Sequence, residues 1–434
     1  MKKRGKRRKP PERKASSPLR GQQIDLNISD MAHGGRGLGW YQGKPVFVPH
    51  TLPGESIRAE ITSGRKNALF ARGLRLKAAS TDRVSPRCPH FGPGQCWGCQ
   101  WQHIDYPAQL LLKQDVLADQ LSRLGKLPDA LIESALRSPL PATTLWEYND
   151  SISLLRGESG DWGLWREGGG VEAIDECHIT HPALLDLLAH LDLDYATARR
   201  MTLRRDSDGR MMLIFDIDAE EAPELSVDLP LSVNLVLPDR EPVNLIGDAH
   251  SRYEVAGQEF RVTAGAYIRP NVSGIERLVA EVMRALCLQG DESALDLYAG
   301  VGIYSAFTAQ EAALVTLVES YPPAVSDADV NLSEFETVDV IEGQVEAVLA
   351  DMIAEDARYD VALVDPPTTG LSKETIAGLA RLEVGRLVYV SGDPGSLAHN
   401  CRQLMSAGFQ LREIQPIDLA PHTYYLTCVA RFER

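Results

Sequence analysis

The feature that most constrains this fold is a regular alternation of amphipathic helices and short apolar strands, which begins near residue 272. The helical pattern IERLVAEVMRALCL is followed by the strand ALDLY, the glycine turn AGVG and a second helical pattern, IYSAFTAQEA. The apolar strands LVTLVES, YDVALV and RLVYVS then alternate with further helical segments. Apolar strands separated by helices are typical of parallel sheets. The sequence therefore predicts a doubly wound α/β domain over residues 271–434.

Two β-rich regions precede this domain. Residues 22–79 consist of short alternating segments with glycine-containing turns between them, which predicts a small all-β barrel. Residues 80–270 hold a cysteine-containing loop, an amphipathic helix in YPAQLLLKQDVLADQLSRLG and a hairpin signal at Asp208-Gly209. We therefore expect a β-rich central domain between the barrel and the α/β domain.

The charge of the chain is unevenly distributed. The net charge is −15, yet residues 1–20 hold ten Lys/Arg side chains and one acid, Glu12. The remaining residues carry 35 bases and 59 acids. Residues 1–21 contain three prolines and almost no apolar side chains, so we predict a disordered basic arm. The arm either binds nucleic acid or is a solvated tail without a partner.

The hydropathy of the chain argues against a membrane-spanning protein and against a secreted one. No apolar run reaches the roughly 18 residues that a membrane-spanning helix needs, and no apolar stretch follows the basic N-terminus as it would in a secretory signal. A hydrophobic fraction of 44% with 24% charged residues is ordinary for a globular protein and excludes a fibrous chain. We therefore expect a cytoplasmic monomer without a membrane partner.

Three of the seven cysteines, Cys88, Cys96 and Cys99, lie within twelve residues of one another. A disulfide framework is rare in a cytoplasmic chain of this length, so the group points to a metal. Zinc and iron–sulfur clusters both take four ligands, and Cys177, in the polar segment DECHITHP, is the natural fourth. Cys287 belongs to an amphipathic helix and is predicted to lie in the core. The spacing leaves zinc and an iron–sulfur cluster both open.

The glycine turn after the strand ALDLY indicates a nucleoside cofactor. Gly300 and Gly302 lack a Cβ, which lets a ligand approach the backbone closely. Glu319 ends the next strand, where a carboxylate can accept hydrogen bonds from ribose hydroxyls. Tyr304 and Ser305 follow where a dinucleotide fingerprint has its third glycine. This pattern favours S-adenosylmethionine over NAD, and the alternative is a tight turn without a ligand.

A second motif, VDPPTTG, ends another apolar strand. Ligands of doubly wound domains bind outside the carboxyl ends of the strands, and Asp365 is expected to point there. Its two prolines remove N–H donors and stiffen the turn. Together with the glycine turn, the motif indicates a cofactor site.

These motifs together resemble the bacterial RNA uracil-C5 methyltransferases, especially the branch that acts on 23S ribosomal RNA. The resemblance covers nearly the whole chain after residue 22 and rests on YIRPN, LDLYAGVG, VDPP, VYVSGDP, PHTYYLTCVARF and cysteines followed by Gln100 and Gln102-His103. It implies a TRAM barrel, a central domain with a [4Fe–4S] cluster, and a class I (Rossmann-like) methyltransferase domain that acts on RNA, here ribosomal RNA. The cluster ligands that it implies are Cys88, Cys96, Cys99 and Cys177.

The resemblance also implies how S-adenosylmethionine is held. Besides the turn at Gly300 and Gly302, the cofactor would meet Arg269, Tyr298, Glu319, Gln344 and Asp365. Two positions depart from the family pattern. Arg269 stands where the family has a glutamine, and Ile303 stands where it usually has a polar side chain.

The departures at the catalytic positions are larger. The family adds a cysteine thiolate to C6 of uracil, C5 then attacks the methyl group, and a glutamate removes the C5 proton. The cysteine position is Gly392 here, and the glutamate position is Thr427. Cys428 should face away from Thr427 in a strand, and Cys401 lies nine residues past Gly392. Two functions stay open: a methyltransferase of this family with altered chemistry, or a non-catalytic RNA-binding homologue that retains the cluster and cofactor scaffold.

Overall fold

The chain is described here by a computed structural model that covers residues 19–191, 197–218 and 228–434. These residues form two compact units, one ending at Arg83 and the other beginning at Val84. Residues 1–18 of the predicted basic arm lie outside the described residues, and the boundary predicted at residue 270 lies inside the second unit. Within the described ranges, no helix combines the length and the apolar character that crossing a membrane requires.

The first unit is a closed barrel, which confirms the predicted small β-barrel. Its strand order is β1-β2-β3-β5-β4, and every neighbouring pair is antiparallel except β3 and β5. Alternate residues of the first strand, Ile24, Leu26 and Ile28, point into the barrel core. The alternation of apolar and polar residues, from which the strands were predicted, thus also forms the barrel core. The strands are β1 (Gln23–Ala32), β2 (Arg36–Tyr41), β3 (Lys44–Val48), β4 (Ser56–Arg65) and β5 (Ala68–Ala78).

The second unit begins with the cysteine-containing loop and a long helix, α1 (Tyr106–Arg123), followed by α2 (Asp129–Ala135). A seven-stranded sheet comes next, in the order β12-β11-β10-β9-β6-β7-β8. The hairpin predicted at Asp208-Gly209 joins β9 to β10, and Gly209 adopts a φ of +81° in its turn. The elements are β6 (Ser151–Arg156), β7 (Trp162–Trp165), β8 (Val171–Ala173), α3 (Pro182–Ala189), β9 (Ala198–Arg205), β10 (Met211–Ile217), β11 (Leu231–Val236) and β12 (Pro242–Ile246).

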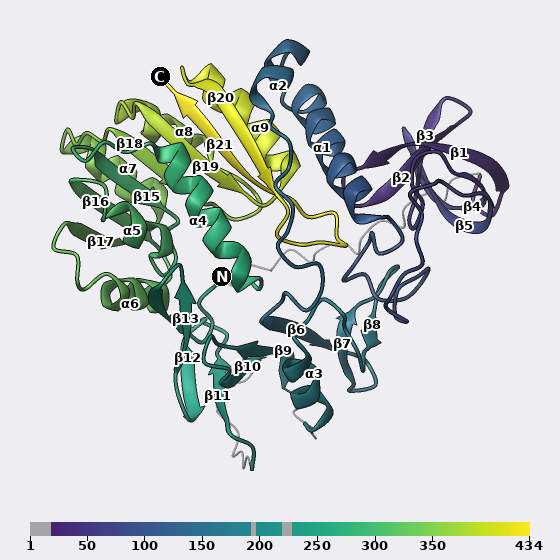
Figure 1. Cartoon of the computed structure of the whole chain (residues 1–434), viewed down its shortest axis with the longest axis horizontal. Helices are drawn as coiled ribbons and strands as arrows, with labels where there is room; N and C mark the ends of the chain where they lie inside the picture. The colour runs from purple at the N-terminus through teal and green to yellow at the C-terminus, as the bar shows by residue number, and fades with distance from the viewer. Residues whose placement is uncertain (1–18, 192–196, 219–227) are drawn as a thin grey trace, which may run out of the picture. The chain divides into compact units, whose positions relative to one another are not determined.

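A two-stranded hairpin, β13 (His250–Val255) and β14 (Gln258–Thr263), leads into the α/β domain. The sheet of this domain has the order β17-β16-β15-β18-β19-β21-β20, and the first five strands are parallel (Figure 1). Strand β21 runs antiparallel to both of its neighbours. The predicted doubly wound sheet is therefore confirmed. Its strands are β15 (Ser293–Leu297), β16 (Leu314–Glu319), β17 (Val338–Glu342), β18 (Val361–Val364), β19 (Arg386–Ser391), β20 (Gln410–Ile417) and β21 (Thr427–Glu433).

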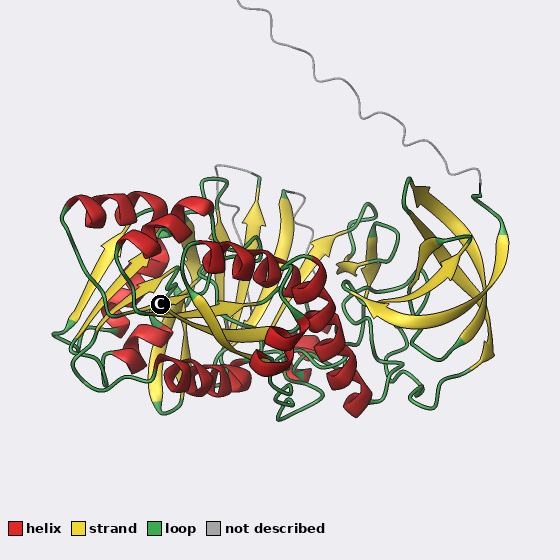
Figure 2. Ribbon diagram, turned by 90° about the horizontal axis from the view of Figure 1, so that it is seen from above, coloured by secondary structure: helices red, strands yellow, loops and turns green. Residues whose placement is uncertain are grey.

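Helices cover both faces of this sheet (Figure 2). One apolar cluster joins the sheet to α1, α2, α7, α8 and α9, and a second joins its other face to α4, α5 and α6. Strands buried on both faces need apolar side chains throughout, which explains why they read as continuous apolar runs. The helices are α4 (Val272–Leu286), α5 (Ile303–Thr308), α6 (Pro322–Asn331), α7 (Val345–Ala354), α8 (Lys373–Arg381) and α9 (Pro394–Ser406).

Two local predictions need correction. Helix α4 ends at Leu286, and Cys287 follows in the left-handed conformation with a φ of +50°. Cys287 is therefore exposed and not in the core, because the chain has already turned away from the buried face of the helix. The helical pattern that begins at Ile303 gives only α5, which ends at Thr308.

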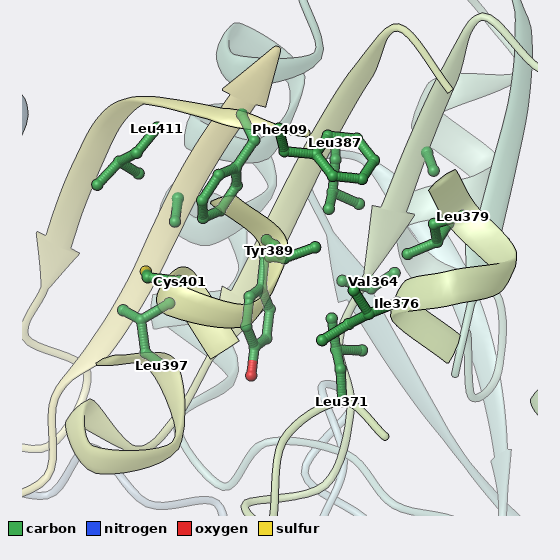
Figure 3. Close-up of a cluster of buried hydrophobic side chains, with 14 of the residues drawn as sticks. Val364, Leu371, Ile376, Leu379, Leu387, Tyr389, Leu397, Cys401, Phe409 and Leu411 are labelled. Carbon is green, nitrogen blue, oxygen red and sulfur yellow. The ribbon is translucent and has the colours of Figure 1, made fainter. Parts of the chain in front are cut away.

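The cluster on the α9 face also contains both of the remaining cysteines, Cys401 and Cys428. Figure 3 shows Cys401 among the buried side chains of this cluster, which include Leu397 and Tyr389. Burial raises the pKa of Cys401 to about 12 and also raises the pKa of Cys428. Both thiols are therefore protonated core side chains at neutral pH.

Candidate functional site

Four of the residues predicted to bind the cofactor, and Gly392 at the position of the family nucleophile, lie at the ends of adjacent strands of the parallel sheet. Glu319 ends β16, Gly300 follows β15, Asp365 follows β18, Gln344 follows β17 and Gly392 follows β19. Because these strands are parallel neighbours, their carboxyl ends meet along one edge of the sheet. We call this edge, from Gln344 to Gly392, the carboxyl edge.

The glycine turn and Glu319 hold each other in place. The Gly300 N–H donates to Glu319 Oε2 at 2.9 Å, and the N–H groups of Ser320 and Tyr321 donate to Oε1 at 2.7 and 2.8 Å. A Cβ on Gly300 would meet no atom within 4 Å, so the space beside this backbone is open. Glu319 therefore fixes the turn, and a carboxylate with about four acceptor positions still has room for a hydroxyl donor.

Asp365 is already paired at this edge. The Arg269 Nη2 donates to Asp365 Oδ1 at 2.9 Å and to Oδ2 at 2.7 Å, and the Tyr304 hydroxyl donates to Oδ2 at 3.2 Å. Burial alone would lower the pKa of Arg269, but the Asp365 carboxylate raises it. Burial, followed by the nearby carboxylate, also raises the pKa of Tyr304 well above its ordinary value. The three groups therefore form a neutral set of one cation, one anion and one protonated phenol.

Asp296, a residue that the sequence reasoning missed, lies behind the glycine turn in β15. Its side chain is buried and Oδ2 accepts from the Ser305 hydroxyl at 2.7 Å, whereas Oδ1 has no partner among the described residues. Burial raises its pKa to about 7, and the negative charges of Asp365 and Glu319 add to the shift. The signal in the sequence was a single acid inside the apolar strand ALDLY. A buried carboxylate oxygen without a partner is a position where a ligand donor can bind.

Two other residues of the predicted set lie at the same edge with different contacts. The Tyr298 hydroxyl is 3.1 Å from Thr375 Oγ1 in α8, and its backbone has a φ of +60°. Gln344 precedes α7 at the N-cap position, and its side chain makes no capping hydrogen bond. Gly302, also predicted, precedes α5 at the N-cap position with a φ of +84°, and a Cβ there would lie 2.9 Å from a Leu332 methyl group. Gly302 therefore serves helix packing as well as the turn.

The positions that correspond to the family nucleophile and base lie on neighbouring strands. Ser391 of β19 pairs with Cys428 of β21, so one further step of this register brings Gly392 opposite Thr427. Thr427 is buried, and a Cβ on Gly392 would meet no atom within 4 Å. The two positions are therefore close together, and the space beside Gly392 is open to a Cβ.

The four cysteines of the predicted cluster line one cavity in the second unit. The cavity has a volume of about 30 Å³, and its lining also includes His90, Glu176 and His178. Two hydrogen bonds already point at its sulfur atoms: the Gly98 N–H donates to Cys96 Sγ and the Thr180 hydroxyl donates to Cys177 Sγ, each at 3.3 Å. Among the described residues, no three His, Cys, Asp or Glu side chains are close enough to share one ion as they stand.

Burial changes the protonation of these thiols. It raises the pKa of Cys96 to about 11 and also raises the pKa of Cys88 and of Cys99. The three thiols are therefore neutral at pH 7 in the absence of a cation. A bound metal reverses this preference, because it binds the thiolate and releases the proton.

The cysteine loop is attached to the segment that leads into β21. The N–H groups of Gln100 and Trp101 donate to the His422 carbonyl at 3.1 and 2.9 Å. Nearby, Lys113 of α1 and Asp418 form a fully buried ion pair with an N–O distance of 2.7 Å. Removal of either partner would leave an uncompensated buried charge, at a cost of about 3–5 kcal/mol. The segment before Thr427 is thus held by both α1 and the cysteine loop.

Comparison with known proteins gives two family matches. Residues 248–434 match the sequence family described as tRNA (Uracil-5-)-methyltransferase, and residues 19–74 match the TRAM domain. A protein of Streptomyces avermitilis named uncharacterized RNA methyltransferase is 32% identical over 95% of this chain and 98% of its own length. A protein of Streptomyces coelicolor with the same description is 30% identical over 96% of this chain and 93% of its own length.

One solved structure has a similar fold over most of the chain. It is the Pyrococcus abyssi tRNA (uracil-54, C5)-methyltransferase in complex with S-adenosyl-L-homocysteine, with a TM-score of 0.69. It is 20% identical in sequence, and the match covers 94% of this chain and all of that one. At this identity the match establishes the fold.

Proposed function

The chain belongs to the RNA (uracil-5-)methyltransferase family and carries a TRAM domain, and from this premise we propose that it binds S-adenosylmethionine and RNA without methylating uracil by the covalent family route. The observation that carries this proposal is the pair Gly392 and Thr427. These positions face each other beside the carboxyl edge, and neither offers a thiol or a carboxylate.

The covalent route needs both groups for a chemical reason. C5 of uracil is a weak nucleophile until a thiolate adds to C6, and glycine has no side chain that could add. The C5 proton must then be removed by a base, and such a base contributes about 10²–10⁴-fold to the rate. Cys401 and Cys428 are protonated core side chains, so neither takes the place of the missing nucleophile.

Retention of the donor-binding groups supports continued cofactor binding. The backbone beside Gly300 is open, Glu319 holds the turn through three N–H groups, and one buried oxygen of Asp296 has no partner within the part of the chain that the structure describes. In this proposal Glu319 accepts from a ribose hydroxyl. Tyr298, Gln344, Asp365, Arg269 and the glycines complete the cofactor contacts.

The second candidate is a methyltransferase of the same family with altered chemistry. The retained cofactor-binding groups favour this candidate, because a protein that transfers methyl groups needs a complete site for the methyl donor. It differs from the first candidate in one measurable property, which is transfer of the methyl group to RNA.

We further propose that Cys88, Cys96, Cys99 and Cys177 hold a [4Fe–4S] cluster. In support, all four thiols line one cavity, and N–H and O–H groups already donate to two of the sulfurs, as is common around such clusters. The group would cross-link the loop of residues 88–99 to Cys177. Stoichiometric zinc without iron in the purified protein would contradict the cluster and indicate a zinc site instead.

The RNA partner that we propose is ribosomal, as the resemblance to the 23S branch implies, and the TRAM domain and basic arm are the parts proposed to bind it. Methyl transfer from labelled S-adenosylmethionine to total RNA separates the two candidates. We expect no transfer to uracil C5 and no covalent adduct with RNA that contains 5-fluorouracil, although the RNA is retarded on a native gel. A covalent adduct would overturn the first candidate.

A further inference from the structure

Arg269 neutralises Asp365, the carboxylate that follows β18 at the carboxyl edge. Its guanidinium contacts both oxygens of Asp365, at 2.9 and 2.7 Å, and both side chains are more than four-fifths buried. Tyr304 donates to the same carboxylate at 3.2 Å. Asp365 therefore has no oxygen that is free of a donor, and its negative charge is neutralised by the chain itself.

The segment that carries Arg269 is fixed on both sides. Before it, the buried Arg204 donates to the carbonyls of Thr263 and Ala266, the latter at 3.0 Å. After it, the Asp150 N–H donates to the Pro270 carbonyl at 2.8 Å, and Asn271 Nδ2 donates to the Leu419 carbonyl at 2.8 Å. The guanidinium is therefore held at the carboxyl edge by its backbone as well as by Asp365.

The charges along the carboxyl edge determine how strongly it binds a positively charged ligand. Glu319 is bound by three N–H groups at the end of β16, Asp296 titrates near neutral pH, and Asp365 is paired with Arg269 at the end of β18. A donor whose ribose lies at Glu319 extends past the β15 turn toward Asp365, since β15 lies between β16 and β18. At that end S-adenosylmethionine carries a sulfonium charge, whereas S-adenosylhomocysteine carries a neutral thioether.

We propose that Arg269 makes this site prefer the neutral thioether S-adenosylhomocysteine over the sulfonium S-adenosylmethionine. The inference rests on the cofactor site proposed above. A free Asp365 carboxylate several ångströms from the sulfonium would attract it by more than the 1.4 kcal/mol that corresponds to a tenfold change in affinity. Arg269 neutralises this carboxylate, so the sulfonium would lose its hydration without gaining a counter-charge. We therefore expect the wild-type protein to bind the thioether at least about tenfold more tightly.

Calorimetry with both ligands tests the proposal in the full-length protein. Arg269→Gln removes the cation and frees Asp365, so the affinity for S-adenosylmethionine should rise about tenfold or more while that for S-adenosylhomocysteine changes by less than about threefold. Arg269→Lys should keep the wild-type preference. Arg358→Gln is the matched control, because Arg358 lies before β18 at the opposite end of the sheet and pairs only loosely with Glu383, at 3.8 Å.

A second variant keeps the test informative if Arg269→Gln is poorly folded. Asp365→Asn keeps the cation without its partner, so the site becomes positive and the preference for S-adenosylhomocysteine should grow by about tenfold or more. Equal affinities in the wild type, a preference for S-adenosylmethionine, or equal changes for both ligands in Arg269→Gln would overturn the role of Arg269. Failure of the wild type to bind either ligand would instead overturn the proposed cofactor site, and this inference with it.

Discussion

The two halves of the carboxyl edge differ in what they retain. On the β15 and β16 side, Glu319 is hydrogen-bonded to the turn at Gly300, whose backbone borders open space. The buried Asp296 has one oxygen without a partner among the described residues. On the β19 and β21 side, Gly392 and Thr427 leave space but supply no nucleophile and no base. In the function proposed above, the cofactor site persists without the acceptor chemistry, because the two halves are built from different strands.

The sharpest test of this difference is to restore the acceptor half. Gly392→Cys with Thr427→Glu should convert a protein that forms no adduct with 5-fluorouracil RNA into one that forms it, because the register places the two side chains opposite each other. A denaturing gel detects the adduct. Gly392→Ser with Thr427→Glu is the control, since a hydroxyl is a far weaker nucleophile. If the cysteine variant is folded and still inert, the acceptor half has changed at more than these two positions.

The cysteine cavity provides a second test, because it is attached to the segment that enters the acceptor half. Cys99→Ser should reduce the iron content from about four atoms per chain to less than one. The affinity for S-adenosylhomocysteine should change by less than about threefold, since the described residues that line the cavity include none from β15 or β16. Cys287→Ser, at an exposed helix end, is the matched control and should keep its iron. Iron that persists in Cys99→Ser would contradict the proposed ligand set.

The donor half is tested at Glu319. Glu319→Ala removes the acceptor of three N–H groups and should weaken binding of S-adenosylhomocysteine by about 1–3 kcal/mol in calorimetry. Glu342 pairs with Glu319 in the register of β16 and β17 and is exposed, so Glu342→Ala is the control and should bind as the wild type does. Equal effects of the two substitutions would mean that the ribose is held elsewhere.

Asp296 predicts a pH dependence for the donor half. Its folded-state pKa of about 7 lies above the ordinary value of 3.8, so the folded protein holds the proton more tightly than the unfolded chain. The free energy of unfolding should therefore fall as the pH rises from about 4 to 7, by an amount on the order of 1–4 kcal/mol. Asp296→Asn should remove most of this slope in urea titrations at several pH values. A slope that survives the substitution would assign the effect to another group.

The smallest expected effect concerns RNA binding. Residues 1–83 carry 19 Lys/Arg and 6 Asp/Glu side chains, whereas residues 84–434 carry 26 and 54. The acidic second unit should repel RNA, so deletion of residues 1–20 should weaken binding and flatten its dependence on salt. We expect the slope of log K against log salt to fall by at least about 2, which corresponds to a few phosphate contacts. An unchanged slope would leave the barrel as the part that holds RNA.

The sequence by itself determined the architecture. Apolar runs separated by helical patterns specified the doubly wound sheet, and period-two alternation with glycine turns specified the barrel, because burial on two faces or one leaves a direct mark on the residue pattern. The sequence also predicted that the strand-end residues Glu319 and Asp365 lie at one edge of the sheet, because parallel strands run in the same direction. It was wrong about Cys287, because where a helix ends depends on backbone conformation more than on apolar spacing.

Only the tertiary structure decided how these residues interact. The pairing of Arg269 with Asp365 joins positions that are 96 residues apart, and no local pattern predicts it. The alignment of Gly392 with Thr427 depends on the register of two strands, and the pKa of Asp296 depends on burial beneath the glycine turn. Periodicity reports which face of an element is buried, whereas charge pairing and ionisation depend on atoms that distant segments bring within a few ångströms.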